Sequence, residues 1–337
     1  MTEGKNNSIQ LSFLKKLETI IPANTSFAGE IADILDISAD SAYRRLRGET
    51  ALSIDEVVKL CNHFKISFDS FNNPETGLVS FKYNLIESDE KSFKIYLESI
   101  FRELKIINSS PEKQIIYACE DIPIFHNFNY PELASFKIFY WMRSIMNVPE
   151  LQKEYVDISI VSDELRNLGK QVFNLYASIP SIEIWTETTI NSTLKQIEFY
   201  YDSGVFKNKE DALKICDVLR TLLDDIKKQA ENGHKLNDQK KIPGPENSYT
   251  VYFSEIEITN NCVLVNMGDI KAVFLGHFTF NTMSTTNVTY CYETEKWLNA
   301  IIKKSTLISG ISEKHRYQFF KKTLQNLDKL VDKIKND

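Results

Sequence analysis

Apolar residues recur at intervals of three and four along residues 8–71, the spacing of helices that each bury one face. Helix-capping residues separate these runs, because serines precede the second, third and fourth, and a glycine follows the third. The pattern therefore predicts four short helices. The first spans residues 8–21, the second follows Ser26, the third lies between Ser38 and Gly48, and the fourth begins at the Ser53–Glu56 capping box.

The third predicted helix has one apolar and one polar side. Ala42 and Leu46 point the same way on a helical wheel, and the small Ala42 allows a close approach to the preceding helix. The other side and its flanks gather polar and charged side chains, including three arginines: Asp40, Ser41, Tyr43, Arg44, Arg45 and Arg47.

The overall charge of the chain does not indicate nucleic-acid binding. The chain has a formal net charge of -6, and residues 1–73 contain eight basic and ten acidic residues, a net charge of -2. DNA-binding domains usually have a basic footprint. The third predicted helix and its end, however, carry three arginines and one acidic residue, Asp40. Any DNA binding would therefore depend on a focused patch on this helix, with modest non-specific affinity.

Residues 31–71, IADILDISADSAYRRLRGETALSIDEVVKLCNHFKISFDSF, resemble the Cro/C1-type (XRE-like) helix-turn-helix family, and the run SAYRRLRGE resembles regulators of Bacteroidota. The shared features are the helix-turn-helix core, the glycine after the recognition helix, the capped helix that follows, and the closing segment KISFDSF. The sequence departs from the family in lacking the glutamines that often begin the second and third helices, and in carrying Arg45 where relatives often have an apolar residue.

The resemblance implies that the third helix enters the major groove of double-stranded DNA. It also implies which side chains contact DNA: Ala39, Asp40, Ser41, Tyr43, Arg44, Arg45 and Arg47. The alternative is a four-helix module that contacts only proteins, with its arginines forming a solvated face. Clustered arginines favour the DNA-binding interpretation, because arginine binds guanine and phosphate with two hydrogen bonds each.

Turn-forming residues 72–77 end this first region. The predicted organisation is an all-α helix-turn-helix domain over residues 1–73, a linker over 74–82, and a larger α+β (mixed α/β) domain over 83–337, with a possible subdomain join at 233–248. Strands are expected at 114–119, 181–185, 249–258, 262–266 and 271–280. Hairpin turns are expected at Asn260-Asn261 and at Met267-Gly268-Asp269.

Candidate catalytic residues are few. Cys119, Asp121 and His126 lie close in sequence, but their spacing fits no zinc pattern and Pro123 restricts the backbone between them, so we interpret them as structural. The motifs of dinucleotide, phosphate-loop, zinc-protease and serine-hydrolase sites are absent from the sequence. We therefore expect no enzymatic activity, no cofactor and no metal site.

The five cysteines are scattered and odd in number, which is typical of reduced thiols in a cytoplasmic protein. The amino terminus does not resemble a signal peptide, and no apolar run is long enough to cross a bilayer. A cytoplasmic protein without a membrane partner is the resulting expectation.

Two features of the larger region bear on its role. Aromatic residues are dense between Phe93 and Trp141, where they could form either a ligand pocket or part of the core. In the terminal helix an apolar stripe follows a heptad spacing, which fits either a dimer seam or packing within the domain: Tyr317, Phe320, Leu324, Leu327, Val331 and Ile334.

These patterns predict a DNA-binding transcription regulator of the helix-turn-helix type. The larger domain is expected to dimerise, to sense an unknown small-molecule or protein effector, or to do both, and a homodimer would read a palindromic operator. Two alternatives remain at this stage. One is an antitoxin-like or phage-type repressor whose large domain binds a protein partner, and the other is an enzyme tethered to DNA.

Overall fold

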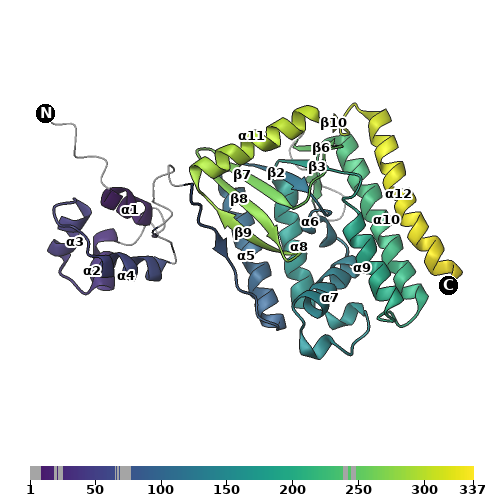
Figure 1. The fold of residues 1–337 in the computed structure, drawn as a ribbon, viewed down its shortest axis with the longest axis horizontal. Coiled ribbons are helices and arrows are strands. Elements are labelled where there is room, and N and C mark those ends of the chain that lie inside the picture. Colours follow the sequence, from purple (N-terminus) through teal and green to yellow (C-terminus); the bar gives the residue numbers. More distant parts are fainter. Residues whose placement is uncertain are drawn as a thin grey trace. The chain divides into compact units, whose positions relative to one another are not determined.

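The computed structural model describes residues 9–18, 21, 26–64, 66, 68, 77–237, 242–243 and 248–337. The chain forms two compact units, residues 1–80 and 81–337, which we call the first and second units (Figure 1). The first three residues of the predicted linker, 74–76, lie outside the described residues. The predicted class, an α-helical region followed by a larger α+β domain, is confirmed.

The first unit contains the four predicted helices, α1 Ile9–Glu18, α2 Phe27–Leu35, α3 Ala39–Leu46 and α4 Ile54–Phe64. Residue 8 and residues 19–20, which the sequence assigned to the first helix, are not among the described residues. The helices bury a small common core, in which Ala42 has no exposed surface. Its fully or nearly fully buried members come from all four helices: Phe13, Leu14, Leu17, Ile31, Ala32, Leu35, Ala42 and Leu60.

The second unit is built around a mixed sheet flanked by helices (Figure 1). Its α-helices are α5 Glu90–Ser109, α6 Ile124–Asn127, α7 Pro131–Tyr140, α8 Asp163–Ser178, α9 Asn191–Asp202, α10 Lys209–Asn232, α11 Val288–Lys304 and α12 Glu313–Asn336. The strands of the sheet are β1 Lys82–Tyr83, β2 Gln114–Cys119, β3 Ser181–Trp185, β6 Tyr249–Phe253, β7 Cys262–Met267, β8 Ile270–His277, β9 Asn281–Thr285 and β10 Thr306–Leu307. A separate small ladder pairs β4 Leu236–Asn237 with β5 Ile242–Pro243.

The strand order is β1-β9-β8-β7-β2-β3-β6-β10. Strands β2, β3 and β6 run parallel and are joined by helical crossovers, whereas the remaining neighbours are antiparallel. The predicted hairpin at residues 267–269 is confirmed, since Met267 pairs with Ile270 and Gly268 adopts a φ of 63°. The predicted hairpin at Asn260-Asn261 is wrong, because two other strands lie between β6 and β7.

The side chain of Asn261 explains why a turn-like sequence occurs in the segment that leads from β6 to β7. Its Oδ1 accepts hydrogen bonds from the backbone N–H groups of Glu120 (3.0 Å) and Asp121 (3.3 Å), just beyond the end of β2. The neighbouring Asn260 donates from Nδ2 to the carbonyl of Gly276 on β8 (3.1 Å). These asparagines therefore attach the segment before β7 to two other strand ends.

The two faces of the sheet belong to different cores. Along β2, Ile115 and Tyr117 join the larger core shared with α5, α7, α8, α10 and α12, whereas Ile116 and Ala118 face the smaller core shared with α11. Figure 1 shows α11 running along one side of the sheet, apart from the other helices. This alternation follows from the two-residue period of a strand.

The apolar stripe of the terminal helix packs inside the second unit. Phe320, Leu327, Val331 and Ile334 are at most 8% exposed within the larger core, and α12 lies against α10 (Figure 1). Of the two interpretations of its heptad spacing, packing within the domain is therefore the one observed. Tyr317 is the exception, with 56% of its surface exposed. In the described part of the chain, no helix has the length and apolar character needed to cross a membrane.

Candidate nucleic-acid interface

The helix-turn-helix frame is fixed by its own caps. The N–H of Gly29 donates to Ser26 Oγ at the start of α2 (3.3 Å), and Asp36 ends that helix in the left-handed conformation, with a φ of 57°. At the start of α3, the N–H of Ser41 donates to Ser38 Oγ (3.3 Å). These local hydrogen bonds set the entry of α3 relative to α2, as their sequence positions predict.

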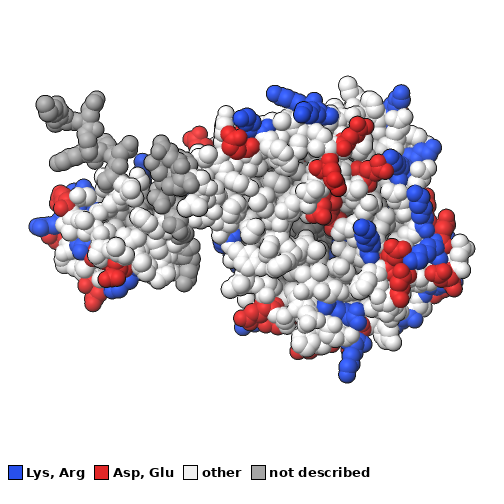
Figure 2. All heavy atoms as spheres, viewed as in Figure 1, with Lys and Arg blue, Asp and Glu red and all other residues white. Residues whose placement is uncertain are grey.

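The outer side of α3 presents exposed arginines. The side chain of Arg44 is 58% exposed and lies 3.1 Å from Asp40, one turn earlier, and that of Arg47 is 54% exposed and lies 2.7 Å from Glu49. Tyr43 is also exposed, at 49%. Ion pairs this exposed contribute little free energy, so either guanidinium can exchange its carboxylate for a phosphate or a base edge. Figure 2 shows acidic and basic residues interspersed on the visible face of the first unit.

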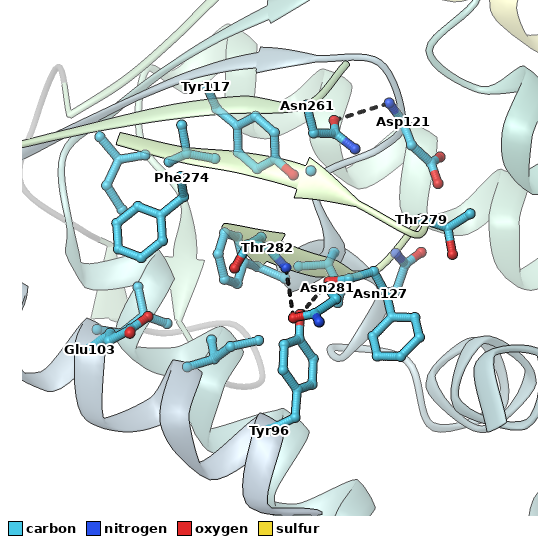
Figure 3. Close-up of a pocket in the computed structure, with 18 of the residues that line it drawn as sticks. Tyr96, Glu103, Tyr117, Asp121, Asn127, Asn261, Phe274, Thr279, Asn281 and Thr282 are labelled. Atoms are coloured by element: carbon cyan, nitrogen blue, oxygen red, sulfur yellow. Dashed lines mark hydrogen bonds between the residues drawn. The ribbon is translucent and has the colours of Figure 1, made fainter. Parts of the chain in front are cut away.

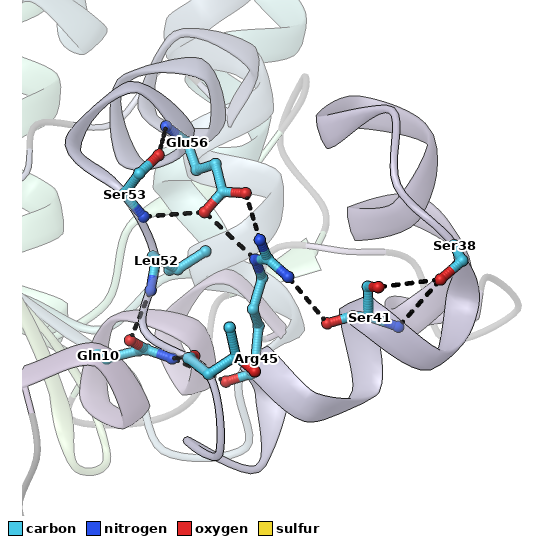
Figure 4. A network of polar contacts seen from close by, with 8 residues as sticks. Gln10, Ser38, Ser41, Arg45, Leu52, Ser53 and Glu56 are labelled. Atoms are coloured by element: carbon cyan, nitrogen blue, oxygen red, sulfur yellow. Dashed lines mark hydrogen bonds and ion pairs between the residues drawn. The ribbon is translucent and has the colours of Figure 1, made fainter.

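Arg45 has a different environment from the other two arginines (Figure 4). Its Nη2 and Nε donate to the carboxylate of Glu56 at 2.7 and 3.2 Å, and its Nη1 donates to the carbonyl of Ser41 at 3.3 Å. The side chains of Arg45 and Glu56 are only 16% and 17% exposed. Arg45 therefore ties α3 to the start of α4, and this geometry argues against its predicted role at the DNA surface.

Glu56 completes the predicted capping box at the same time. Its Oε2 accepts from the backbone N–H of Ser53 (2.9 Å), and its own N–H donates to Ser53 Oγ (3.2 Å). Burial raises the pKa of Glu56, but the hydrogen bonds from Arg45 and Ser53 and the charge of Arg45 outweigh burial, so the net shift is downward. One carboxylate thus joins the cap of α4 to the back of α3.

Gln10 is a structural residue of this site that sequence reasoning missed. Its Nε2 donates to the carbonyls of Arg45 and Thr50, and its Oε1 accepts from the N–H of Leu52, each at 2.9 Å (Figure 4). The side chain therefore holds the turn that follows α3. The partners are 35 to 42 residues away in sequence, so no local signal indicates the contact.

The predicted DNA-contacting set divides accordingly. Exposed positions on α3 or at its end include Ala39, Asp40, Tyr43, Arg44 and Arg47. Ser41 is half-buried, with its hydroxyl 3.0 Å from that of Ser38. Arg45 is committed to Glu56. The structure thus offers one exposed face of α3, centred on Tyr43 and Arg44, as the candidate interface.

Comparison with known proteins bears on the first unit. Residues 7–76 match the family model of the BetR domain. The first unit is a helical domain of DNA-binding type, and the match indicates a DNA-binding regulatory role. No curated protein and no solved structure is similar to the chain. The match does not extend into the second unit.

The residues considered for chemistry in the second unit have different polar partners. Cys119 is fully buried at the end of β2, and burial raises the pKa of its thiol well above the usual value. Asp121 lies 3.5 Å from Nζ of the buried Lys137, whereas His126 lies 2.8 Å from Glu183. No group of three or more metal-binding side chains occurs within the described ranges.

Glu183 on β3 is the centre of a buried polar network. It has no exposed surface, and it accepts hydrogen bonds from Tyr176 Oη (2.5 Å), Trp185 Nε1 (2.8 Å) and Tyr249 Oη (2.9 Å) while His126 Nε2 lies 2.8 Å away. Burial alone would raise the pKa of Glu183, but the charge and hydrogen bond of His126, the hydrogen bond of Tyr176 and the charge of Lys235 together outweigh burial and lower the pKa to about 2. None of these side chains lines the apolar cavity between α5 and the sheet that is described below, and we assign the network to stability.

Proposed function

We propose that the protein is a cytoplasmic, sequence-specific transcription regulator of the Cro/C1 type, with α3 as the recognition helix. The exposed face of α3 carries this proposal. It presents Tyr43 and Arg44 from a rigid two-helix frame, and its ion pairs are weak enough to open on DNA. We expect Arg47, which is exposed at the end of the helix, to contact phosphate.

The second unit is proposed to dimerise, to sense an effector, or to do both. A single helix-turn-helix contacts few bases, and symmetric pairing on a palindrome multiplies specificity. Because the stripe of α12 is buried in its own domain, a homodimer must use another surface. The effector would change the spacing of two recognition helices and thereby the affinity for the operator.

Selection of bound fragments from genomic DNA with the full-length chain tests this function. We expect a recurrent palindromic motif, and Arg44→Ala should weaken binding to it by about 10- to 100-fold, the value of one bidentate base contact. Lys59→Ala is the matched control, since it removes an exposed charge from α4 and should change affinity far less. Equal affinity of wild type and Arg44→Ala would refute the recognition-helix assignment.

A further inference from the structure

The second unit contains a cavity of about 100 Å³ between α5 and the sheet strands β2, β7, β8 and β9 (Figure 3). Its walls are mainly apolar, and the side chains come from four elements: Leu104, Ile107, Ile115, Val263, Val265 and Phe274. Close-packed interiors rarely leave such space unfilled. The cavity is large enough for a small organic molecule, and its walls favour an apolar one.

One end of the cavity is polar, and most of its polar groups already have partners. Asn261 accepts from the backbone of residues 120–121, and Asn281 donates from Nδ2 to the carbonyl of Asn84 (2.9 Å). Asp121 accepts from Thr193 Oγ1 at 3.3 Å and from Lys137 Nζ at 3.5 Å. These contacts hold the polar end in place without a ligand.

Asn127 on α6 is different. It lines the cavity, its side chain is 1% exposed, and its Oδ1 is buried without a hydrogen-bond partner in the described structure. An unpaired buried carbonyl is costly, and such groups in native proteins call for an explanation. The terminal amide turns over a broad range of χ2, so Oδ1 can meet a donor placed in the cavity. An N–H or O–H group placed in the cavity would supply the missing partner.

The cavity is also connected to the segment that follows the first unit in sequence. Strand β1, at residues 82–83, pairs with β9, which contributes Asn281 and Thr282 to the cavity. Lys82 Nζ lies 3.8 Å from Glu103, another lining residue. Through these contacts, a change in the packing of β9 or Glu103 alters the packing of β1, where the second unit begins.

The turn between β8 and β9 adds a strained element at the cavity. Phe278 and Thr279 have φ values of 48° and 65°, in the left-handed region that bulky and β-branched residues rarely adopt. Thr279 and the following Phe280 line the cavity. Strained non-glycine backbone of this kind clusters at ligand clamps.

We propose that this cavity binds a small, largely apolar molecule carrying one hydrogen-bond donor, and that the bound molecule is the effector of the regulator. The donor pairs with Asn127, and the apolar body fills the space between α5 and β7. Occupancy stiffens β9 and, through it, β1. The regulatory role rests on the proposed function above, whereas the binding site stands on the cavity and on Asn127 alone.

Calorimetric titration of the full chain with indole and with indene tests the site. The two probes have nearly the same shape, and only indole has an N–H donor. We expect indole to bind about tenfold more tightly, which corresponds to the net contribution of one good hydrogen bond. Asn127→Leu should remove this preference while it leaves indene binding intact, which shows that the variant is folded. Asn299→Leu, on the exposed side of α11, is the matched control and should keep the preference.

Val263→Phe fills the cavity and should abolish binding of both probes without unfolding the chain, as judged from its circular dichroism. Absence of millimolar binding of indole to the wild type overturns the proposal, as does an indole preference that survives in Asn127→Leu. Hydrogen exchange of the amides of residues 82–84 should slow with indole, and an unchanged rate overturns the connection to β1. Failure to select DNA refutes the proposed function and leaves these binding results unaffected.

Discussion

The contact between Arg45 and Glu56 allows a test of whether Arg45 has a structural role or contacts DNA. The pair is bidentate, with distances of 2.7 and 3.2 Å, and both side chains are less than one fifth exposed. Surface ion pairs contribute up to about 1 kcal/mol, whereas hydrogen bonds to charged groups in less exposed sites contribute about 1.5–3 kcal/mol. We therefore expect Arg45→Met, which keeps most of the aliphatic stem, to cost the first unit about 2 kcal/mol.

Hydrogen exchange of the full-length chain, read by mass spectrometry, measures this cost locally. A loss of about 2 kcal/mol accelerates exchange of the α3 amides by about 30-fold. Glu56→Gln should have a similar effect, because the amide still accepts from the N–H of Ser53 but no longer pairs with the charge of Arg45. The double variant should cost less than the sum of the two single changes, since both remove the same interaction.

Binding to the selected operator then gives the decisive comparison. If Arg45 is structural, Arg45→Met and Glu56→Gln should lower affinity equally and by less than about threefold, because the first unit remains largely folded. If Arg45 instead reads a base, Arg45→Met should lose about 10- to 100-fold while Glu56→Gln, which releases the guanidinium, binds as well as the wild type. That second pattern would refute the assignment of Arg45 to the interior of the first unit.

Two further predictions concern the second unit. Because the pKa of Glu183 is lowered from 4.5 to about 2, its ionised form contributes stability that is fully present above pH 4.5 and is lost as the pH falls towards 2, by about 3 kcal/mol in all. Urea unfolding followed by tryptophan fluorescence should show a smaller loss over this range in Glu183→Gln, and parallel pH profiles for the two proteins would contradict this account. Leu327→Asp places a charge at a position with no exposed surface and should cost more than about 3 kcal/mol in the same unfolding assay. A stable variant that merely dissociates in sedimentation would show instead that this stripe is a subunit interface.

The first unit was predictable in most of its parts because its signals are local. Capping serines, the left-handed Gly48 and the three-to-four spacing each act within a few residues of themselves, and the four helices occur where these signals place them. The role of Arg45 was not predictable in this way. Its partner lies 11 residues later on another helix, and a helical wheel cannot show which flank a neighbouring helix covers.

In the second unit, too, features set by local sequence were predictable and features set by distant contacts were not. The sequence indicated the strands at 114–119 and 181–185, which the structure confirms. The first is a nearly continuous apolar run buried on both faces, whereas the second is interrupted by the buried Glu183. It did not indicate the strand order, and the asparagine pair that resembled a hairpin turn serves a segment before β7 instead. Of the aromatic residues between Phe93 and Trp141, Tyr96 and Tyr117 line the cavity, and Phe136 and Phe139 are buried in the core.

The sequence by itself determined the helices of the first unit, the fold class of the second, and the location of a candidate recognition helix. These follow from propensity, capping and periodicity, which are properties of short segments. Only the tertiary structure decided that Arg45 points to Glu56, that the stripe of α12 is covered by its own domain, and that Oδ1 of Asn127 is left unpaired beside a cavity. Each of these depends on which distant segment supplies the neighbouring atoms, and that choice is made by the packing of the whole unit.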